Sequence, residues 1–299
     1  MTVRTRNRLI AFSIIAAPFV FLLCLLLFWD AEPLPPVPPL PHLNGYEDLV
    51  KAGQMITQNV SHHDEMNQQE LRALVETNSK ALLLARAGLQ QECRVPLQFS
   101  PAYPDLDKMS GLKKLAQAFT AEGELAEKEK RYGDAVKSYL DTIRLGNETA
   151  RGGLLIDQLV ELAVEAVGTS HLQEIMNNLD SKSCRKTAAA LETLDSQRQT
   201  WDEVMQQERD WSRRTFTGIR YELVRLVERH SLEKIFQNAE QQFDKQRSKT
   251  RQLIIEFAAR AYELDKGHRP ASIADLVPGY LKSIPQDPLT GTNMVYPPR

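Results

Sequence analysis

An uncharged apolar run near the N-terminus constrains this chain more than any other feature. The run extends from Leu9 to Trp29, and three arginines precede it at positions 4, 6 and 8. As a helix, its 21 residues would be roughly 31 Å long, which matches a hydrocarbon core of about 30 Å. A buried core helix fits poorly because the run has no polar side to turn toward water. We therefore expect a transmembrane helix over residues 9–29, in contact with the lipid bilayer.

The charges around this run predict its orientation. The three arginines should stay in the cytoplasm, because positive residues flank membrane helices on the cytoplasmic side. A cleaved signal peptide is disfavoured, because cleavage after Ala31 would place the bulky Trp29 where the peptidase needs a small residue. The sequence predicts a single-pass protein of the inner (cytoplasmic) membrane, with residues 1–8 in the cytoplasm and the body outside.

Residues 30–43 form a proline-rich segment that holds six of the 16 prolines of the chain. Proline fixes φ and has no amide hydrogen, so neither a helix nor a sheet is expected here. Polyproline II is the remaining regular conformation, and it suits a stalk that holds the body away from the membrane. Recognition of this segment as a PxxP ligand is the alternative.

Composition indicates the class of the body. Beyond residue 29 the chain carries 34 lysines and arginines against 39 acids, a net charge of −5, which excludes a general affinity for nucleic acid. The chain has only 14 glycines and many alanine, leucine, glutamate and glutamine residues, which favour helices. We predict a mainly α fold, with an extracytoplasmic helical body over 44–249 and a small α+β segment over 250–299.

Local signals divide the body into helices. Asn67-Gln-Gln-Glu70 is a capping box that should open a long helix ending before Pro96. Residues 93–108 contain three prolines and are predicted to be an extended connector. Residues 185–265 should form two or three further helices, whose alternating acids and arginines suggest a solvated, ion-paired face.

One helix pair carries a recognisable pattern. Phe119 precedes Gly123 by four residues, and Ala135 precedes Tyr139 by four. In this spacing, residues 112–146 resemble one tetratricopeptide repeat (TPR), in which two helices cross at small residues. The resemblance implies a helical hairpin that must pack on its neighbours, since a single repeat cannot bury both of its faces. We expect a scaffold here, with a peptide-binding groove as the alternative.

The last fifty residues carry a second pattern. Gly267 should end a helix, Ser272-Ile-Ala-Asp275 is a capping box, and proline-rich turns with one or two short strands should follow. The segment resembles the C-terminal region of the major pseudopilin of type II secretion, and the architecture resembles uncharacterised membrane-anchored proteins of planctomycete-type bacteria. The resemblance implies a fold for this segment and no site. It rests on Tyr262, Gly267, Pro270, Leu276, Tyr280, Leu281, Ile284, Pro285, Asp287, Pro288, Gly291 and Tyr296.

A search for chemistry finds no catalytic, cofactor-binding or metal-binding motif. The densest cluster of ligand-type residues is His62-His63-Asp64-Glu65, but adjacent histidines point to different faces of a helix, so a polar loop is expected. Asp287, which precedes a proline, should form a turn. Cys93 and Cys184 lie outside the predicted membrane span, where disulfides persist, so they either pair with each other or are two free, buried thiols.

These observations favour a non-catalytic scaffold that is anchored in the membrane and holds a protein partner in the cell envelope. Two alternatives remain. The first is an enzyme that acts on envelope polymers through paired acids, which a deep cleft holding two acids of raised pKa would favour. The second is a secretion component related to the pseudopilins.

Overall fold

A computed structural model describes residues 17–18, 34–57, 60–103, 105–216 and 219–296, with the backbone alone over 219–232. Within these residues the fold is mainly α, as predicted, and contains no strand. The predicted membrane span over 9–29 lies outside the described residues, apart from Ala17 and Pro18. Among the helices that are described, none combines the length and the apolar composition needed to cross a membrane.

The first helices form one side of the body. Helix α2 (Gly45–Gln54) packs against α3 (Gln68–Leu89), and a one-turn 3-10 helix, η1 (His63–Glu65), lies between them in the chain. The predicted capping box is confirmed, because the Asn67 side chain accepts from the Glu70 amide at 3.1 Å and the Glu70 carboxylate accepts from the Asn67 amide at 2.8 Å. Helix α3 ends before Pro96, as expected.

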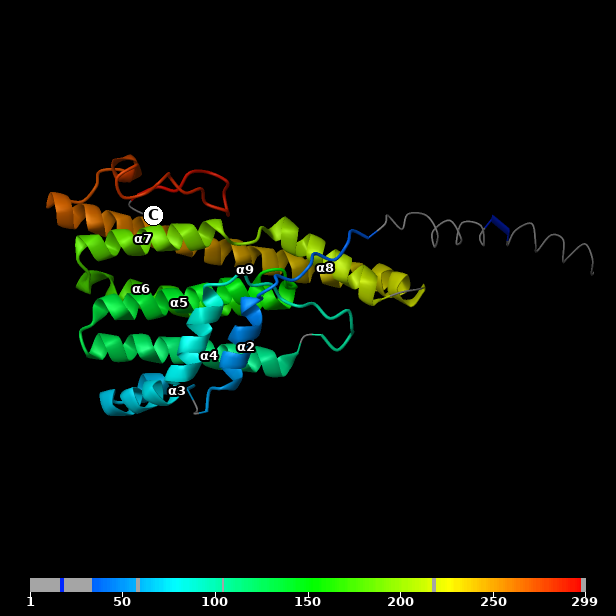
Figure 1. Ribbon diagram of the computed structural model, residues 1–299. Coiled ribbons are helices and arrows are strands. Elements are labelled where there is room, and N and C mark those ends of the chain that lie inside the picture. Colours follow the sequence, from blue (N-terminus) through cyan, green and yellow to red (C-terminus); the bar gives the residue numbers. More distant parts are fainter. Residues whose placement is uncertain (1–16, 19–33, 58–59, 104, 217–218, 297–299) are drawn as a thin grey trace, which may run out of the picture.

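The next three helices stack side by side (Figure 1). Helix α5 (Tyr132–Ala150) packs on both α4 (Leu106–Lys128) and α6 (Leu155–Ile175). The predicted helical hairpin over 112–146 is therefore present, while its relation to the tetratricopeptide family stays a prediction. Where the hairpin helices meet, a Cβ atom on Gly123 would lie 2.3 Å from Cε1 of Tyr139, so only glycine permits this approach.

Three further helices complete the body, which confirms the number predicted between residues 185 and 265. After the short η2 (Met176–Asn178), α7 (Ser181–Ser196) packs along α9 (Ile219–Lys266), which also contacts α6. Figure 1 places α8 (Trp201–Thr215) at the end of the body where the proline-rich residues from 34 onward lie. The two are in contact there, since the Arg214 guanidinium donates to the carbonyl oxygen of Pro35.

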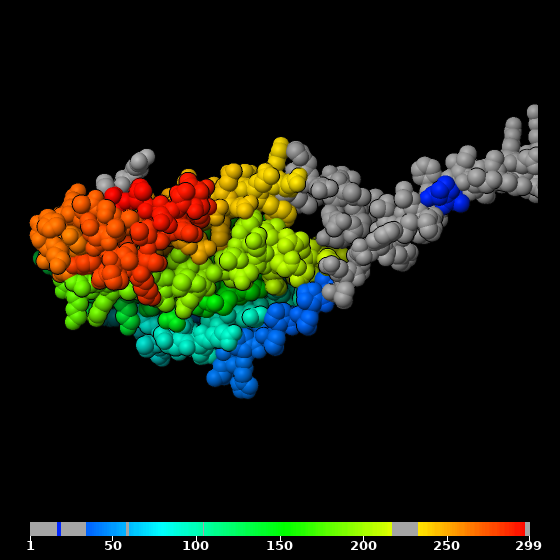
Figure 2. Space-filling view, turned by 90° about the horizontal axis from the view of Figure 1, so that it is seen from above, coloured from blue at the N-terminus to red at the C-terminus, as the bar shows by residue number. Residues whose placement is uncertain are grey.

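The C-terminal segment packs on the helices of the body. Gly267 ends α9 with φ 76°, and at the start of η3 (Ile273–Leu276) the Asp275 carboxylate accepts from the Ser272 amide at 2.9 Å, as in the predicted capping box. Leu276 and Leu281 belong to the same buried cluster as α5, α7 and α9. Figure 2 shows the tail spread over the face made by α7 and α9. The predicted border between residues 249 and 250 falls inside α9, so the segment shares its core with the helical body.

The expectation of one or two short strands in this segment is wrong. Among the described residues it holds only an isolated antiparallel bridge between Gln286 and Asn293. Pro285 and Pro288 flank the bridge and lack the amide hydrogens that a longer ladder needs. Asp287 forms the predicted turn, and its carboxylate accepts from the Leu289 amide at 3.2 Å.

The close approach in the α4–α5 hairpin can be tested with one methyl group. Replacing Gly123 with alanine should lower the free energy of unfolding by about 1–3 kcal/mol, because the new Cβ overlaps the Tyr139 ring. Replacing Gly133 with alanine is the matched control. A Cβ there meets nothing within 4 Å, so this variant should gain about 0.5–1 kcal/mol from helix propensity. Urea unfolding measures both, and equal effects would contradict the packing described.

Candidate functional site

Helix α6 turns its charged side inward and part of its apolar side outward. Three of its four acids and one amide lie in the interior, with exposed fractions of 8, 2, 3 and 1% for Asp157, Gln158, Glu161 and Glu165. Its apolar residues Ile156, Leu159 and Val167 are 37, 40 and 44% exposed. A surface helix ordinarily buries its apolar stripe and exposes its charges. In α6, a contact inside the body must therefore explain the buried acids, and a contact outside it would explain the exposed apolar residues. We call this arrangement the reversal of α6.

The cause is a buried cation. Arg198, in the link between α7 and α8, donates from Nε to Glu161 at 2.8 Å and from Nη2 to Glu165 at 2.6 Å. The Arg198 side chain is 1% exposed, and its guanidinium also lies over the Phe243 ring at 5.5 Å. Thr250 of α9 donates to the other Glu165 oxygen at 2.7 Å. The cluster joins α6, α9 and the α7–α8 link, and its acids are hydrogen-bonded as buried charges require.

Burial shifts the titration of one acid in this cluster and of another acid at the start of α6. Burial raises the pKa of the Glu165 carboxyl to about 7, although Arg198 beside it acts in the opposite direction. At the start of α6, burial raises the pKa of Asp157 to about 6, against a 2.5 Å hydrogen bond that Tyr103 donates to it. Burial therefore moves the titration of both carboxyls toward neutral pH.

A second ionic group lies beside the first. Asp195 at the end of α7 accepts from Arg247 at 3.0 Å and from Arg251 at 2.8 Å, and both arginines are on α9. These groups are mostly buried, with exposed side-chain fractions of 11% for the acid and 17% for each arginine. The two ionic groups together hold α6 and α7 to α9.

The outward side of α6 forms one wall of a groove. The opposite wall is α4, and the groove has a cavity volume of about 610 Å³. Its apolar surface comes mainly from Leu159, Ala163 and Val167 of α6, with Ala116 and Val164 deeper in. The polar groups that line it are His63, Ser110, Lys113, Gln117 and Thr120, and no acid is among them. The groove is therefore an open, largely apolar site with a single lysine at its edge.

The two adjacent histidines singled out in the sequence contact different acids. His63 Nδ1 lies 3.1 Å from Glu124 on α4, whereas His62 Nδ1 lies 3.8 Å from Glu65 in its own turn. His171 of α6 stacks on Tyr139, with the ring centroids 4.8 Å apart. Across the described part of the chain, no three histidine, cysteine or acidic side chains are arranged to hold a metal ion.

Cys93 and Cys184 are buried free thiols in the structure. Cys93 belongs to the cluster around α2, α3 and α4, whereas Cys184 belongs to the cluster around α7 and α9. Burial raises the pKa of the Cys93 thiol to about 12 and that of Cys184 to about 11. Neither thiol is therefore activated for nucleophilic chemistry.

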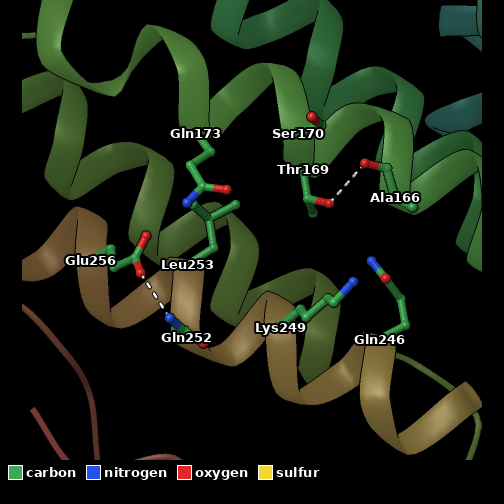
Figure 3. A pocket seen from close by; sticks show the side chains of 9 residues that line it. All are labelled: Ala166, Thr169, Ser170, Gln173, Gln246, Lys249, Gln252, Leu253 and Glu256. Atoms are coloured by element: carbon green, nitrogen blue, oxygen red, sulfur yellow. Dashed lines mark hydrogen bonds between the residues drawn. The ribbon is translucent and has the colours of Figure 1, made fainter. Parts of the chain in front are cut away.

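A polar pocket lies on the other side of α6, between α6 and α9 (Figure 3). Its cavity volume is about 360 Å³. Helix α6 contributes the side chains of Thr169, Ser170 and Gln173, and α9 contributes further amides and charges. Two side-chain hydrogen bonds are visible there, of which one joins Gln252 to Glu256 at 3.0 Å. The outward side of α6 is therefore flanked by an apolar groove and a polar pocket.

Comparison with known proteins identifies no relative of this chain. The chain matches no protein-family model, and neither the search of curated proteins nor that of solved structures returns a match. The site must therefore be interpreted from its own geometry.

Sequence reasoning missed the reversal of α6. A signal for it exists, because Asp157, Glu161 and Glu165 recur at intervals of four and so lie along one stripe of the helix. Such a stripe ordinarily indicates a solvated face. This stripe lies in the interior because Arg198, which is 33 residues beyond Glu165 in the chain, binds its acids.

The buried acid Glu165 predicts a dependence of stability on pH. From pH 4.5, its ordinary pKa, to about 7, the folded chain binds more protons than the unfolded chain. The free energy of unfolding should therefore fall as the pH rises through this range, by on the order of 1–3 kcal/mol from this group. Glu165→Gln cannot titrate and should lose that part of the dependence.

Urea unfolding at several pH values between about 4.5 and 7.5 measures this difference. Glu174→Gln, on the same helix but 67% exposed, is the control and should behave as the wild type. If Glu165→Gln follows the wild-type curve across the range, the Glu165 carboxyl does not titrate as described.

Proposed function

We propose that this chain is a single-pass, membrane-anchored scaffold outside the cytoplasm, and that the groove between α4 and α6 binds an apolar segment of a partner protein in the envelope. The anchor is the apolar run over 9–29, and the stalk over 30–43 sets the distance from the membrane. The observation that carries the proposal is the outward apolar side of α6, because exposed apolar patches mark interaction sites.

The dimensions of the groove suit a peptide segment. On α4 its lining extends from Met109 to Thr120, and these 11 helical steps correspond to roughly 16 Å. A partner helix of about three turns would match this length. Leu159, Ala163 and Val167 follow the spacing of four by which one helix presents a stripe to another.

The same geometry disfavours the enzyme alternative. Burial raises the pKa values of Asp157 and Glu165, two acids on the inward side of α6. Neither of them lines the groove. Glu165 already accepts from Arg198 and Thr250, and Asp157 accepts from Tyr103 and from the Leu154 amide at 2.8 Å. Their hydrogen-bond capacity is used to hold helices together, which supports a structural role.

Two charges placed in the groove test the proposal. The double variant Leu159→Asp, Val167→Asp should lower recovery of the partner at least about tenfold, because each aspartate would lose its water against an apolar surface. The measurement is affinity purification of the full-length chain from detergent-solubilised membranes, with quantitative mass spectrometry of the proteins that co-purify. Thermal unfolding should be nearly unchanged, since both side chains are substantially exposed.

The matched control is Leu83→Asp on α3. Leu83 is also an exposed leucine, at 66%, but it is not part of the groove. This variant should recover the same proteins as the wild type. Equal recovery by the groove variant and the wild type would contradict the proposal.

A further inference from the structure

The proline-rich segment over 34–43 lies along the body instead of leading away from it. Near its start, the carbonyl oxygen of Pro35 accepts from the Arg214 guanidinium of α8. Where it meets α2, the Asn44 side chain donates to the Arg94 carbonyl oxygen at 2.7 Å and accepts from the Arg94 amide at 2.9 Å. Figure 1 shows the segment running from the start of α2 to α8. The chain is therefore attached to the body already at Pro35.

The part of α8 that contacts Pro35 is itself fixed to the body. Trp211, one turn before Arg214, donates from Nε1 to the Gln98 carbonyl oxygen at 2.8 Å and is buried. The Arg214 guanidinium lies 5.6 Å from the centre of the Phe99 ring. The last turn of α8 and the loop that carries Phe99 therefore form one surface, to which Pro35 is bound.

This contact limits the distance between α8 and the membrane. Trp29 ends the apolar run of the proposed anchor, and only six residue steps separate it from Pro35. A fully extended chain covers at most about 3.6 Å per step, so Pro35 lies no more than roughly 22 Å from the end of the proposed span. The headgroup layer occupies about 5–7 Å of that distance. The last turn of α8 is therefore held close to the membrane surface.

The residues at this end of α8 suit a membrane surface. Its last turn is basic, with Arg213 and Arg214, and the exposed Arg209 lies one turn earlier. Phe216 follows the helix and is 38% exposed. Arginines beside an exposed aromatic residue are typical of protein surfaces that bind anionic membranes.

The acids of α8 leave this end positive. Asp202 and Glu203 are in the first turn, roughly 15 Å along the helix from its last turn. Glu208 faces the body, where it accepts from the Leu155 amide at 2.9 Å. The remaining acid, Asp210, is half-buried. It is one charge against three arginines, so the end of α8 near the proposed anchor favours an anionic partner.

We propose that the last turn of α8 faces the membrane surface and binds anionic phospholipid headgroups through Arg209, Arg213 and Arg214. The inference rests on the proposed anchor over 9–29 but not on the apolar groove. Guanidinium groups bind phosphate oxygens through paired hydrogen bonds. Arg214 uses Nη2 for Pro35, and the other N–H groups of its guanidinium can serve a headgroup. Headgroup binding would hold the body in one orientation on the membrane.

Fluorescence quenching at the membrane surface tests this inference. The full-length chain with Cys24→Ser and Gln206→Cys has one accessible thiol on α8, because Cys93 and Cys184 are buried and position 206 is exposed. A fluorophore on this thiol is measured in phosphatidylcholine vesicles that contain a lipid with a spin-labelled headgroup. Adding about 30% phosphatidylglycerol should increase quenching at least about twofold. Salt at about 1 M should remove the increase, because it shortens the screening length to about 3 Å.

Charge variants of the labelled chain identify the groups responsible. Arg209→Gln combined with Arg213→Gln should lose the response to phosphatidylglycerol, while Arg214 is kept because it also holds Pro35. Lys182→Gln combined with Lys186→Gln is the matched control and should respond as the parent does. Both lysines are exposed and lie near the start of α7, which Figure 1 places at the end of the body away from α8.

A second label position tests the orientation. Glu174, near the end of α6, is 67% exposed, and a fluorophore at Glu174→Cys should be quenched less than one at Gln206→Cys. The inference is overturned by equal quenching at the two positions, by equal quenching with and without phosphatidylglycerol, or by an unchanged response in the arginine variant. Flotation with the vesicles separates this failure from failure of the anchor. A chain that does not float overturns both proposals, whereas a chain that floats without these differences overturns only this one.

Discussion

The contact of Arg198 with Glu161 and Glu165 decides which side of α6 faces the interior. Without a cation, two carboxylates in the interior would each cost several kcal/mol, and α6 would be more stable with its apolar stripe inward. With Arg198 between them, Glu161 and Glu165 can stay inside, while Ile156, Leu159 and Val167 remain on the outside. The buried cluster therefore determines the surface that the protein offers to other molecules.

That surface has two different sides. On the α4 side the outward residues of α6 line an apolar groove, and on the α9 side they border a polar pocket. Both hollows depend on the position of α6 relative to its neighbours. Asp195 also contributes to that position. It binds Arg247 and Arg251 and so holds α7 against α9, the helix that α6 contacts. The ionic groups of the interior thus hold α6 in the position that forms both hollows.

The sequence predicts the local structure well and the site poorly. Asn67, Gly267 and Ser272 act through residues close to them in the chain, so their roles as helix caps and stops could be recognised. The spacing of Phe119, Gly123, Ala135 and Tyr139 predicted a helical hairpin, but not that Gly123 would pack on the Tyr139 ring. The reversal of α6 could not be predicted, because it depends on a distant arginine, and the strands expected near Asp287 failed because prolines remove the donors that they need.

The most direct test of this account is the stability of Arg198→Met compared with that of Arg198→Met combined with Glu161→Leu and Glu165→Leu. At about pH 7.5 the single variant should lose on the order of 3–5 kcal/mol in urea unfolding, because two buried acids lose their cation. The triple variant should recover most of that loss, since an apolar cluster of similar volume replaces the ionic one. A loss below about 1 kcal/mol in the single variant, or no recovery in the triple variant, would contradict the claim that Arg198 holds the charged side of α6 inside.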